Sequence, residues 1–207
     1  KIIAQMVATA GFKGLTGYTG RENVQGEQTR ILDDESDKVL VEVLGSSGNF
    51  GLLVSEERDD VIEADRKLSK DAKYIVAFDP LDGSSNIGSN IPVGTIFTIF
   101  RRATKGSTPT KEDFLQPGTK LVAAGYSVYG AKTSFVYSTG KGAHDFTLDP
   151  TIGEFILTEK KIQIPQEGNI FSTNEGYSTL WDNDLLNYIS HLKSENNVLK
   201  QPYTARY

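Results

Sequence analysis

Two aspartates stand three residues apart in the segment 79–82 (DPLD), directly after the apolar run Tyr74–Phe78. A buried strand over that run would hold Asp79 rigidly, and the neighbouring proline and glycine would bend the chain so that Asp82 returns to the same point. Hard divalent cations such as Mg²⁺ prefer oxygen ligands, and this turn offers two carboxylates and the Leu81 carbonyl. The segment predicts a metal site; the alternative is a surface turn, because Asp, Pro and Gly all favour turns.

Small residues follow the second aspartate as Gly83, Ser84 and Ser85. If one of the serines begins a helix, its free backbone N–H groups face the metal site and could hold a phosphate. A cation and an anion-binding turn side by side are what a phosphate ester needs.

Two adjacent carboxylates, Glu56 and Glu57, follow another apolar run, Leu52–Val54. At the end of a strand they could ligate one metal ion and position a second, or hold an attacking water. The alternative is a solvated charged segment, which the charged residues at 58–60 favour when this motif is taken alone.

A third acidic group lies before the second helical pattern. Asp33 is expected to be the N-cap of that helix, where Asp34, Glu35 and Asp37 would interact favourably with the helix dipole. A structural role is the simpler interpretation of the last three. Glu27 and Asp33 become catalytic candidates only in combination with the other motifs.

Composition limits the chemistry that these groups can serve. The 207 residues are 38% hydrophobic and 24% charged, which is typical of a globular protein with a buried core. A net charge of -5 indicates no general attraction to nucleic acid or to an anionic membrane. No apolar run approaches the ~20 residues that span a bilayer, so we expect no membrane association and a cytoplasmic protein.

The absence of cysteine excludes thiol catalysis and disulfides in this sequence. The two histidines, His144 and His191, do not have the spacing of a ligand pair and are expected to be structural or exposed. A hydrolase with these residues fits metal-activated water better than a covalent intermediate.

Hydrophobic periodicity predicts a layered α/β fold. Helical patterns cover residues 1–10, 39–44 and 183–192, the first broken by Gly11 and the second closed by Gly45. Strand patterns cover residues 74–78, 93–100 and 121–129, and a hairpin joins 133–137 to 145–148 around the glycines at 140 and 142.

The motifs taken together resemble a known family. The segment DPLDGSSN at 79–86 is similar in outline to that of the lithium-sensitive phosphatase superfamily, which includes inositol monophosphatases. The wider set resembles fructose-1,6-bisphosphatase and consists of VSEE at 54–57, FDPLDGSSNI at 78–87, VGTIF at 93–97, LQPG at 115–118, LVAAGY at 121–126, LDPTIGEFIL at 148–157 and NEGY at 174–177.

This resemblance implies the αβαβα layered sugar phosphatase fold, with a metal- and AMP-binding domain at residues 1–162 and the start of a sugar-phosphate-binding domain at 163–207. It implies Mg²⁺-dependent hydrolysis of the 1-phosphate of fructose 1,6-bisphosphate in gluconeogenesis, with Mn²⁺ or Zn²⁺ as substitutes. It also implies a cytoplasmic homotetramer that is inhibited by AMP.

The resemblance carries over residue by residue. The positions similar to metal ligands are Glu56, Asp79, the Leu81 carbonyl and Asp82, and Glu57 matches an acid that joins the metal cluster and orients water. Glu27 and Asp33 match acids that help to deprotonate that water. The positions similar to phosphate contacts are Gly83, Ser84 and Ser85 for the 1-phosphate and Asn174 and Tyr177 for the 6-phosphate. Lys73, Tyr74 and Arg101 match AMP contacts, although the same residues are also ordinary strand ends.

The sequence departs from the family pattern at Glu27 and Gly88, because the family usually has Asp at both positions. By resemblance, the chain begins inside the family's second N-terminal helix, after a segment that completes the AMP site. It ends before a segment with a further glutamate ligand and most of the sugar pocket. A metal site without that ligand should bind its ions weakly.

Two other functions are compatible with parts of this pattern. An inositol or other sugar monophosphatase would share the DPLDGSSN segment, but it needs no second phosphate pocket of the kind that NEGY at 174–177 suggests. A non-catalytic protein with the same fold would have no reason to keep the carboxylates of Glu56, Glu57, Asp79 and Asp82 together.

Overall fold

The structure is a computed structural model that describes residues 1–23, 26, 28–69, 71–104, 109–200 and 202–205. The chain divides into two compact units, Lys1–Ile162 and Gln163–Tyr207, which are described separately. Among the described residues, no helix is long and apolar enough to cross a membrane.

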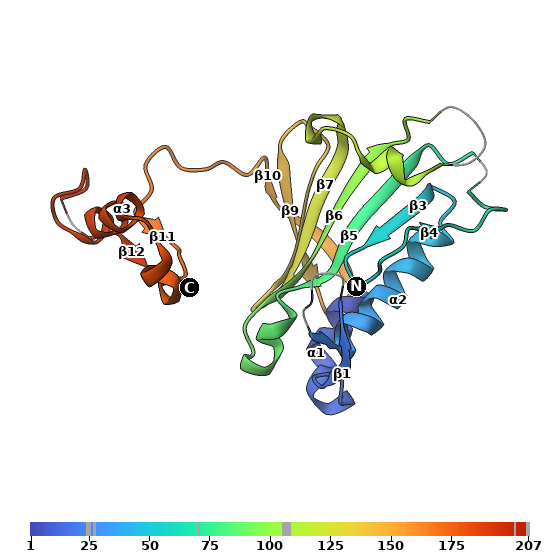
Figure 1. Ribbon diagram of the computed structural model, residues 1–207, viewed down its shortest axis with the longest axis horizontal. Coiled ribbons are helices and arrows are strands. Elements are labelled where there is room, and N and C mark those ends of the chain that lie inside the picture. Colours follow the sequence, from blue (N-terminus) through green and yellow to red (C-terminus); the bar gives the residue numbers. More distant parts are fainter. Residues whose placement is uncertain (24–25, 27, 70, 105–108, 201, 206–207) are drawn as a thin grey trace. The chain divides into compact units, whose positions relative to one another are not determined.

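The first unit is built on one large mixed sheet (Figure 1). Its strands are β3 (Phe50–Ser55), β4 (Ile62–Glu63), β5 (Tyr74–Asp82), β6 (Val93–Arg101), β7 (Leu121–Tyr129), β8 (Thr133–Ser138), β9 (Ala143–Asp149) and β10 (Glu154–Lys160). Their order is β10-β9-β8-β7-β6-β5-β3-β4. Strands β3 and β5 are parallel neighbours, and the other pairs are antiparallel. The α/β class expected from the sequence is confirmed.

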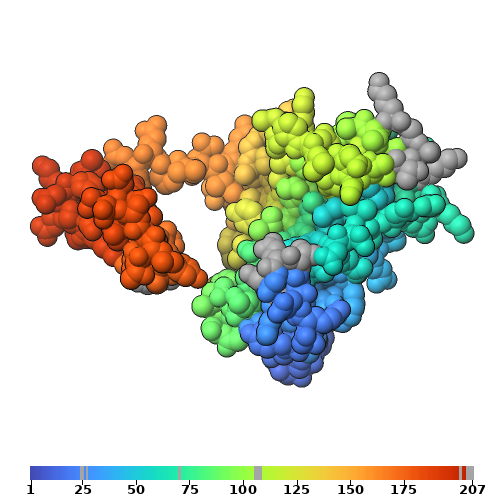
Figure 2. Space-filling view, in the orientation of Figure 1, coloured from blue at the N-terminus to red at the C-terminus, as the bar shows by residue number. Residues whose placement is uncertain are grey.

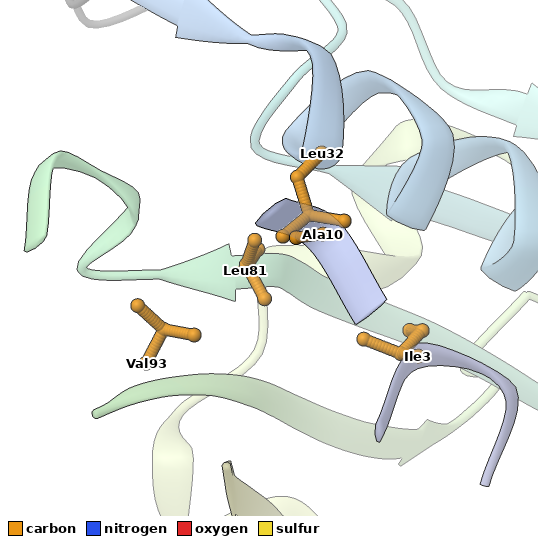
Figure 3. Packing of buried hydrophobic residues seen from close by; sticks show 5 residues of the cluster. All are labelled: Ile3, Ala10, Leu32, Leu81 and Val93. Atoms are coloured by element: carbon orange, nitrogen blue, oxygen red, sulfur yellow. The ribbon is translucent and has the colours of Figure 1, made fainter. Parts of the chain in front are cut away.

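Two helices pack against this sheet, α1 (Ile2–Lys13) and α2 (Ile31–Gly45), and α2 contacts β3 and β5. In Figure 2, the blue N-terminal residues lie against the green and cyan parts of the first unit. A buried cluster joins both helices to β5 and β6 through Ile3, Ala10, Leu32, Leu81 and Val93 (Figure 3). Burial of the larger of these side chains, each contributing about 1.5–3 kcal/mol, holds the N-terminal segment against the end of β5, which carries Asp79 and Asp82.

The end of β5 differs from the expected turn. The strand does not stop at Phe78 but continues through Asp82, with an irregular register between Asp79 and Asp82. Pairing with β6 resumes at Asp82 and Gly94, and the Thr95 hydroxyl donates to the Pro80 carbonyl over 2.9 Å. A proline fits such a bulge because it has no N–H to donate to the ladder.

Two helix boundaries also differ from the expectation. Gly11 lies inside α1, which ends at Gly14 in the left-handed conformation (φ 69°), a backbone state that glycine adopts without strain. Arg30, not Asp33, is the N-cap of α2. Asp33 lies at the third helical position, where its carboxylate accepts a hydrogen bond from the Arg30 N–H at 2.8 Å.

Short elements complete the structure. Strands β1 (Tyr18–Glu22) and β2 (Gln28–Arg30) form an antiparallel pair between the two helices. In the described parts of the chain, the 3₁₀ helices are η1 (Ser84–Ser89), η2 (Lys111–Phe114), η3 (Gly118–Lys120) and η4 (Glu175–Leu180). The second unit contains η4, helix α3 (Asn183–Lys193) and the parallel pair β11 (Ile170–Phe171) and β12 (Thr204–Ala205).

Candidate active site

A cavity of about 170 Å³ collects most of the acidic candidates. Its lining consists of Asn23, Gln28, Thr29, Asp33, Glu56, Glu57, Asp79, Leu81, Asp82, Gly83, Ser84 and Ser85. The structure therefore brings together all of the catalytic, metal-binding and 1-phosphate positions that the sequence suggested, except Glu27, which lies outside the described residues.

The parallel pairing of β3 and β5 explains why the two acidic motifs meet. Ser55 is the register partner of Phe78, so Glu56 and Asp79 follow neighbouring positions at the carboxyl ends of the two strands. The Glu56 N–H donates to the Phe78 carbonyl over 3.1 Å and continues the pairing by one residue. Carboxyl ends of parallel strands point to the same edge of a sheet, where ligand sites of α/β proteins usually form.

Leu81 fixes the peptide between the two aspartates. The Leu81 side chain is buried in the cluster of Figure 3, against the helices. Leu81 is also part of the cavity lining. The Leu81 N–H donates to Asp79 Oδ1 over 2.9 Å. The turn that follows begins at Gly83, whose φ of 77° would strain any other side chain, and Ser84 then opens η1.

Crowding of carboxylates changes their proton affinities. Burial, together with a hydrogen bond to Glu56 and the charge of Glu56, raises the pKa of Asp79 to about 8. Burial and the charge of Asp33 raise the pKa of Glu57 to about 7, although the Thr29 hydroxyl donates to Glu57 Oε2 over 3.3 Å. The cavity therefore has more negative charge than its own donors neutralise.

Asp33 is oriented by the start of α2. Oδ2 accepts from the Arg30 N–H, while Oδ1 is buried with no hydrogen-bond partner within the described part of the chain. Burial raises the pKa of Asp33, and the backbone of Arg30 and the Ser84 hydroxyl act in the opposite direction. An orphaned carboxylate oxygen in an acidic cavity is the kind of group that a cation satisfies.

The donor set fits a hard divalent cation in type and in charge, since it consists of carboxylates and one main-chain carbonyl. Within the described ranges, however, no three acidic or histidine side chains already converge as ligands around one point. Asp79 instead bonds to the Leu81 N–H and interacts with Glu56. Cation binding therefore requires these side chains to turn toward a common centre.

The sequence did not single out three other lining residues, Asn23, Gln28 and Thr29. Gln28 and Thr29 belong to β2 and Asn23 directly follows β1, a strand pair that has no strong hydrophobic pattern. The sequence analysis also gave no role to Arg30. Arg30 stands three residues before Asp33, which is the spacing of a reciprocal helix cap. The interpretation of Asp37 as a helix-dipole residue missed its ion pair with Arg58.

The candidates for AMP binding lie away from this cavity. Tyr74 and Arg101 are cross-strand partners at the start of β5 and the end of β6. The Arg101 guanidinium is 5.3 Å from the centre of the Tyr74 ring, and its Nη2 is 3.4 Å from the hydroxyl. Lys73 is exposed just before Tyr74. The structure thus places Arg101 at the Tyr74 ring, and Lys73 is their neighbour along the chain.

The two 6-phosphate candidates belong to the second unit. The Asn174 side chain caps η4 by accepting a hydrogen bond from the Gly176 N–H at 3.0 Å. Tyr177 lies on the same short helix and is 60% exposed. Its hydroxyl is accessible to a ligand, whereas the Asn174 side-chain oxygen already has a structural partner.

Comparison with known proteins decides the family. The family model for the N-terminal domain of fructose-1-6-bisphosphatase matches residues 1–160. The chain belongs to the fructose-1,6-bisphosphatase family. The resemblance inferred from the motifs is therefore confirmed.

Two class 1 fructose-1,6-bisphosphatases illustrate the similarity. Those of Maridesulfovibrio salexigens and Chloroherpeton thalassium are each 45% identical to the chain over 208 residues. The alignments cover 100% of the chain but 61% and 59% of these relatives. The chain thus spans about three fifths of the length of the fructose-1,6-bisphosphatases it matches.

Solved structures agree with this assignment. The holo form of Leishmania major fructose-1,6-bisphosphatase has a TM-score of 0.90 and 39% identity, covering 100% of the chain and 63% of that protein. The apo form has a TM-score of 0.82 and 36% identity, covering 100% and 61%. The chain has the fructose-1,6-bisphosphatase fold over its whole length.

Proposed function

We propose that the protein hydrolyses the 1-phosphate of fructose 1,6-bisphosphate to give fructose 6-phosphate and inorganic phosphate. The observation that supports this most strongly is the cavity in which Asp33, Glu56, Glu57, Asp79 and Asp82 face the serine turn that follows β5. In a member of this family, that combination provides groups for cations and for a phosphate in one place. Mg²⁺ is the proposed cofactor, with Mn²⁺ or Zn²⁺ as substitutes.

When bound, divalent cations neutralise phosphoryl oxygens and make coordinated water more acidic. Glu56, Asp79, Asp82 and the Leu81 carbonyl would hold them. The backbone and hydroxyl groups of Gly83, Ser84 and Ser85 would hold the 1-phosphate through hydrogen bonds to its oxygens.

The remaining acids would orient the attacking water and accept its proton. The oxygen of water forms a bond to phosphorus, the bond from phosphorus to the sugar oxygen breaks, and that oxygen takes up a proton. Glu57 is the proposed acceptor because its carboxylate lines the cavity next to Glu56 and near the serine turn. Asp33 would assist with its unpartnered Oδ1, and Glu27 is the third proposed acid.

The second unit would determine substrate class. We assign Asn174 and Tyr177 to the 6-phosphate, because an exposed tyrosine hydroxyl beside a capped helical turn can donate to phosphate oxygens. A sugar monophosphatase is the rival enzyme and would not need these contacts.

AMP would bind at Lys73, Tyr74 and Arg101. The proximity of the Arg101 guanidinium to Tyr74, with Lys73 next to Tyr74 in the chain, supports this assignment. A cytoplasmic homotetramer acting in gluconeogenesis is part of the same proposal and is supported by family membership.

The direct test is phosphate release by the complete protein as its gene encodes it. Fructose 1,6-bisphosphate should release one phosphate with Mg²⁺ and none when the cation is chelated, and fructose 6-phosphate should accumulate. Faster release from inositol 1-phosphate than from the bisphosphate would favour the monophosphatase. No release from either substrate would favour the non-catalytic protein.

A further inference from the structure

Arg30 is a buried arginine whose side chain joins three segments beside the cavity. It is 6% exposed. Its Nη1 donates to the Thr16 carbonyl over 2.9 Å, and its Nη2 donates to the Tyr18 hydroxyl over 2.8 Å and to the Ser85 carbonyl over 3.1 Å. The guanidinium also lies 4.3 Å from the centre of the Tyr18 ring. One side chain thus connects the loop after α1, strand β1 and the serine turn.

The backbone of the same residue orients an acid of the cavity. Its N–H donates to Asp33 Oδ2, so any shift of Arg30 moves the start of α2 as well as the serine turn. The bond to Ser85 spans 55 residues and joins β2 to η1. In Figure 2, the green segment that contains η1 lies next to the blue N-terminal elements, in agreement with this bond.

The charge of Arg30 is unusual at this place. The described lining of the cavity contains five acids and no lysine or arginine, and Arg30 lies behind it rather than in it. Its guanidinium bonds to neutral oxygens, and its buried Nε has no partner in the part of the chain that the structure describes. A buried cation without an ion-paired carboxylate is costly, and its charge, which acts on Asp33, would also be felt by an anion at the serine turn.

The positive charge of Arg30 would stabilise a phosphoryl group bound at the serine turn. By holding the Ser85 carbonyl, the guanidinium directs that peptide oxygen away from the cavity and keeps it from facing an anion. Its positive charge adds to the field at the serine turn, where Gly83 and Ser84 are half-buried and Ser85 is exposed. A purely structural clamp would need the hydrogen bonds but not the charge.

We propose that Arg30 is a positioning residue of the phosphate site, which orients the serine turn through Ser85 and supplies positive charge behind it. The inference rests on the proposed function only in identifying the ligand as a phosphoryl group. Three features carry it, namely the bond to Ser85, the bond to Asp33 and the burial of an incompletely paired guanidinium.

The test measures binding of inorganic phosphate, the proposed product, to the complete protein in the presence of Mg²⁺ by titration calorimetry. Thermal midpoints of all variants are measured in parallel. Arg30→Gln keeps a hydrogen-bond donor but loses the charge, and Arg30→Lys keeps the charge but loses the fork that reaches two carbonyls. Tyr18→Phe is the matched control, because it removes one acceptor of the guanidinium without touching Ser85.

We expect Arg30→Gln to weaken phosphate binding about ten-fold or more, because the loss of an interaction with a charged group typically has an effect of this size. Arg30→Lys should lie between Arg30→Gln and the unchanged protein. Tyr18→Phe should lower the thermal midpoint while phosphate affinity stays within about two-fold. If Arg30→Gln does not fold, the comparison of Arg30→Lys with Tyr18→Phe decides the question in the same way.

Phosphate affinity that is equal in Arg30→Gln, Arg30→Lys, Tyr18→Phe and the unchanged protein would overturn the inference and leave Arg30 a structural clamp. Absence of phosphate binding in the unchanged protein would also overturn it. If the unchanged protein binds phosphate but releases none from fructose 1,6-bisphosphate, the proposed function fails while the phosphate measurements still judge Arg30.

Discussion

Arg58 donates a hydrogen bond from Nε to Asp37 Oδ2 over 2.7 Å and thereby ties the loop after β3 to helix α2. The Asp37 side chain is 5% exposed and the Arg58 side chain 40% exposed. Arg58 directly follows Glu57, whose pKa the Asp37 charge helps to raise after the larger effects of burial, Asp33 and Glu56. The pair therefore anchors one proposed catalytic acid to the helix that carries another.

Removing Arg58 should destabilise the protein more than removing both partners. Arg58→Ala leaves a buried, unpaired carboxylate and is expected to cost about 2 kcal/mol, less than for a fully buried pair because Arg58 is partly solvated. The double variant with Asp37→Ala should regain part of that loss. Urea unfolding of the two single variants and the double variant measures the coupling. Strictly additive losses would show that the ion pair does not contribute.

The raised pKa values of Glu57 and Asp79 predict a pH-dependent stability for the metal-free protein. Both carboxyls bind protons more tightly in the folded state, with pKa values of about 7 and about 8, than at their ordinary values of 4.5 and 3.8. Their contribution is therefore most favourable below about pH 4, declines as pH rises, and is lost above about pH 8. Because both groups are partly exposed, the decline should be on the order of 1 kcal/mol.

Thermal unfolding between pH 5 and pH 8 checks this sign in the presence of a chelator. The Glu57→Gln variant is the control, since without this titrating carboxyl its midpoint should fall less over the same range. Mg²⁺ should raise the midpoint more at pH 8 than at pH 5. A midpoint that rises with pH in the metal-free protein would contradict the assignment of repelling carboxylates.

Local patterns were sufficient to predict several strands but not the shape of the site. The apolar run before Asp79 identified β5, because a buried strand needs only a continuous hydrophobic stretch. Its continuation through Asp82 could not be read locally, since it depends on pairing with Gly94 of β6. The β1–β2 pair was missed for a different reason. Its alternation of apolar and polar residues is weak, and its residues are mostly exposed.

For the candidate site too, some residues could be found from the sequence, but their arrangement could not. Asp79, Asp82, Glu56 and Glu57 were found because carboxylates at the ends of apolar runs form a spacing signal in the sequence. Their meeting in one cavity followed from the parallel pairing of β3 and β5, which no local pattern indicates. Arg30 was missed because its side-chain partners are 12 to 55 residues away along the chain.

Tyr177→Phe tests the assignment of the 6-phosphate contact. The change removes only an exposed hydroxyl, whereas Asn174→Ala would also remove the cap of η4. Loss of a hydrogen bond to a charged group costs about 1.5–3 kcal/mol, so kcat/KM for fructose 1,6-bisphosphate should fall roughly ten- to a hundred-fold, mainly through KM. For fructose 1-phosphate, which lacks the distal phosphate, the kinetics should not change. Equal losses with both substrates would reject the assignment.

Arg101→Ala tests the proposed AMP site. The change removes a positive charge and the partner of the Tyr74 ring, so the AMP concentration for half inhibition of the complete protein should rise about ten-fold. Arg102→Ala is the neighbouring control and should have a smaller effect. AMP should also inhibit without competing with the sugar bisphosphate. Direct competition, or no inhibition at millimolar AMP, would return Lys73, Tyr74 and Arg101 to ordinary strand-end residues.

The central claim is that the carboxylates at the end of β5 hold the cation on which hydrolysis depends. Asp79→Asn and Asp82→Asn each remove one carboxylate that could bind a cation, with little change of shape. Phosphate release from fructose 1,6-bisphosphate is measured over a Mg²⁺ titration, with the thermal midpoint of each metal-free variant as the control for folding. Turnover should be abolished in both variants at every Mg²⁺ concentration while both remain folded. Near-normal turnover of either folded variant at saturating Mg²⁺ would contradict the claim.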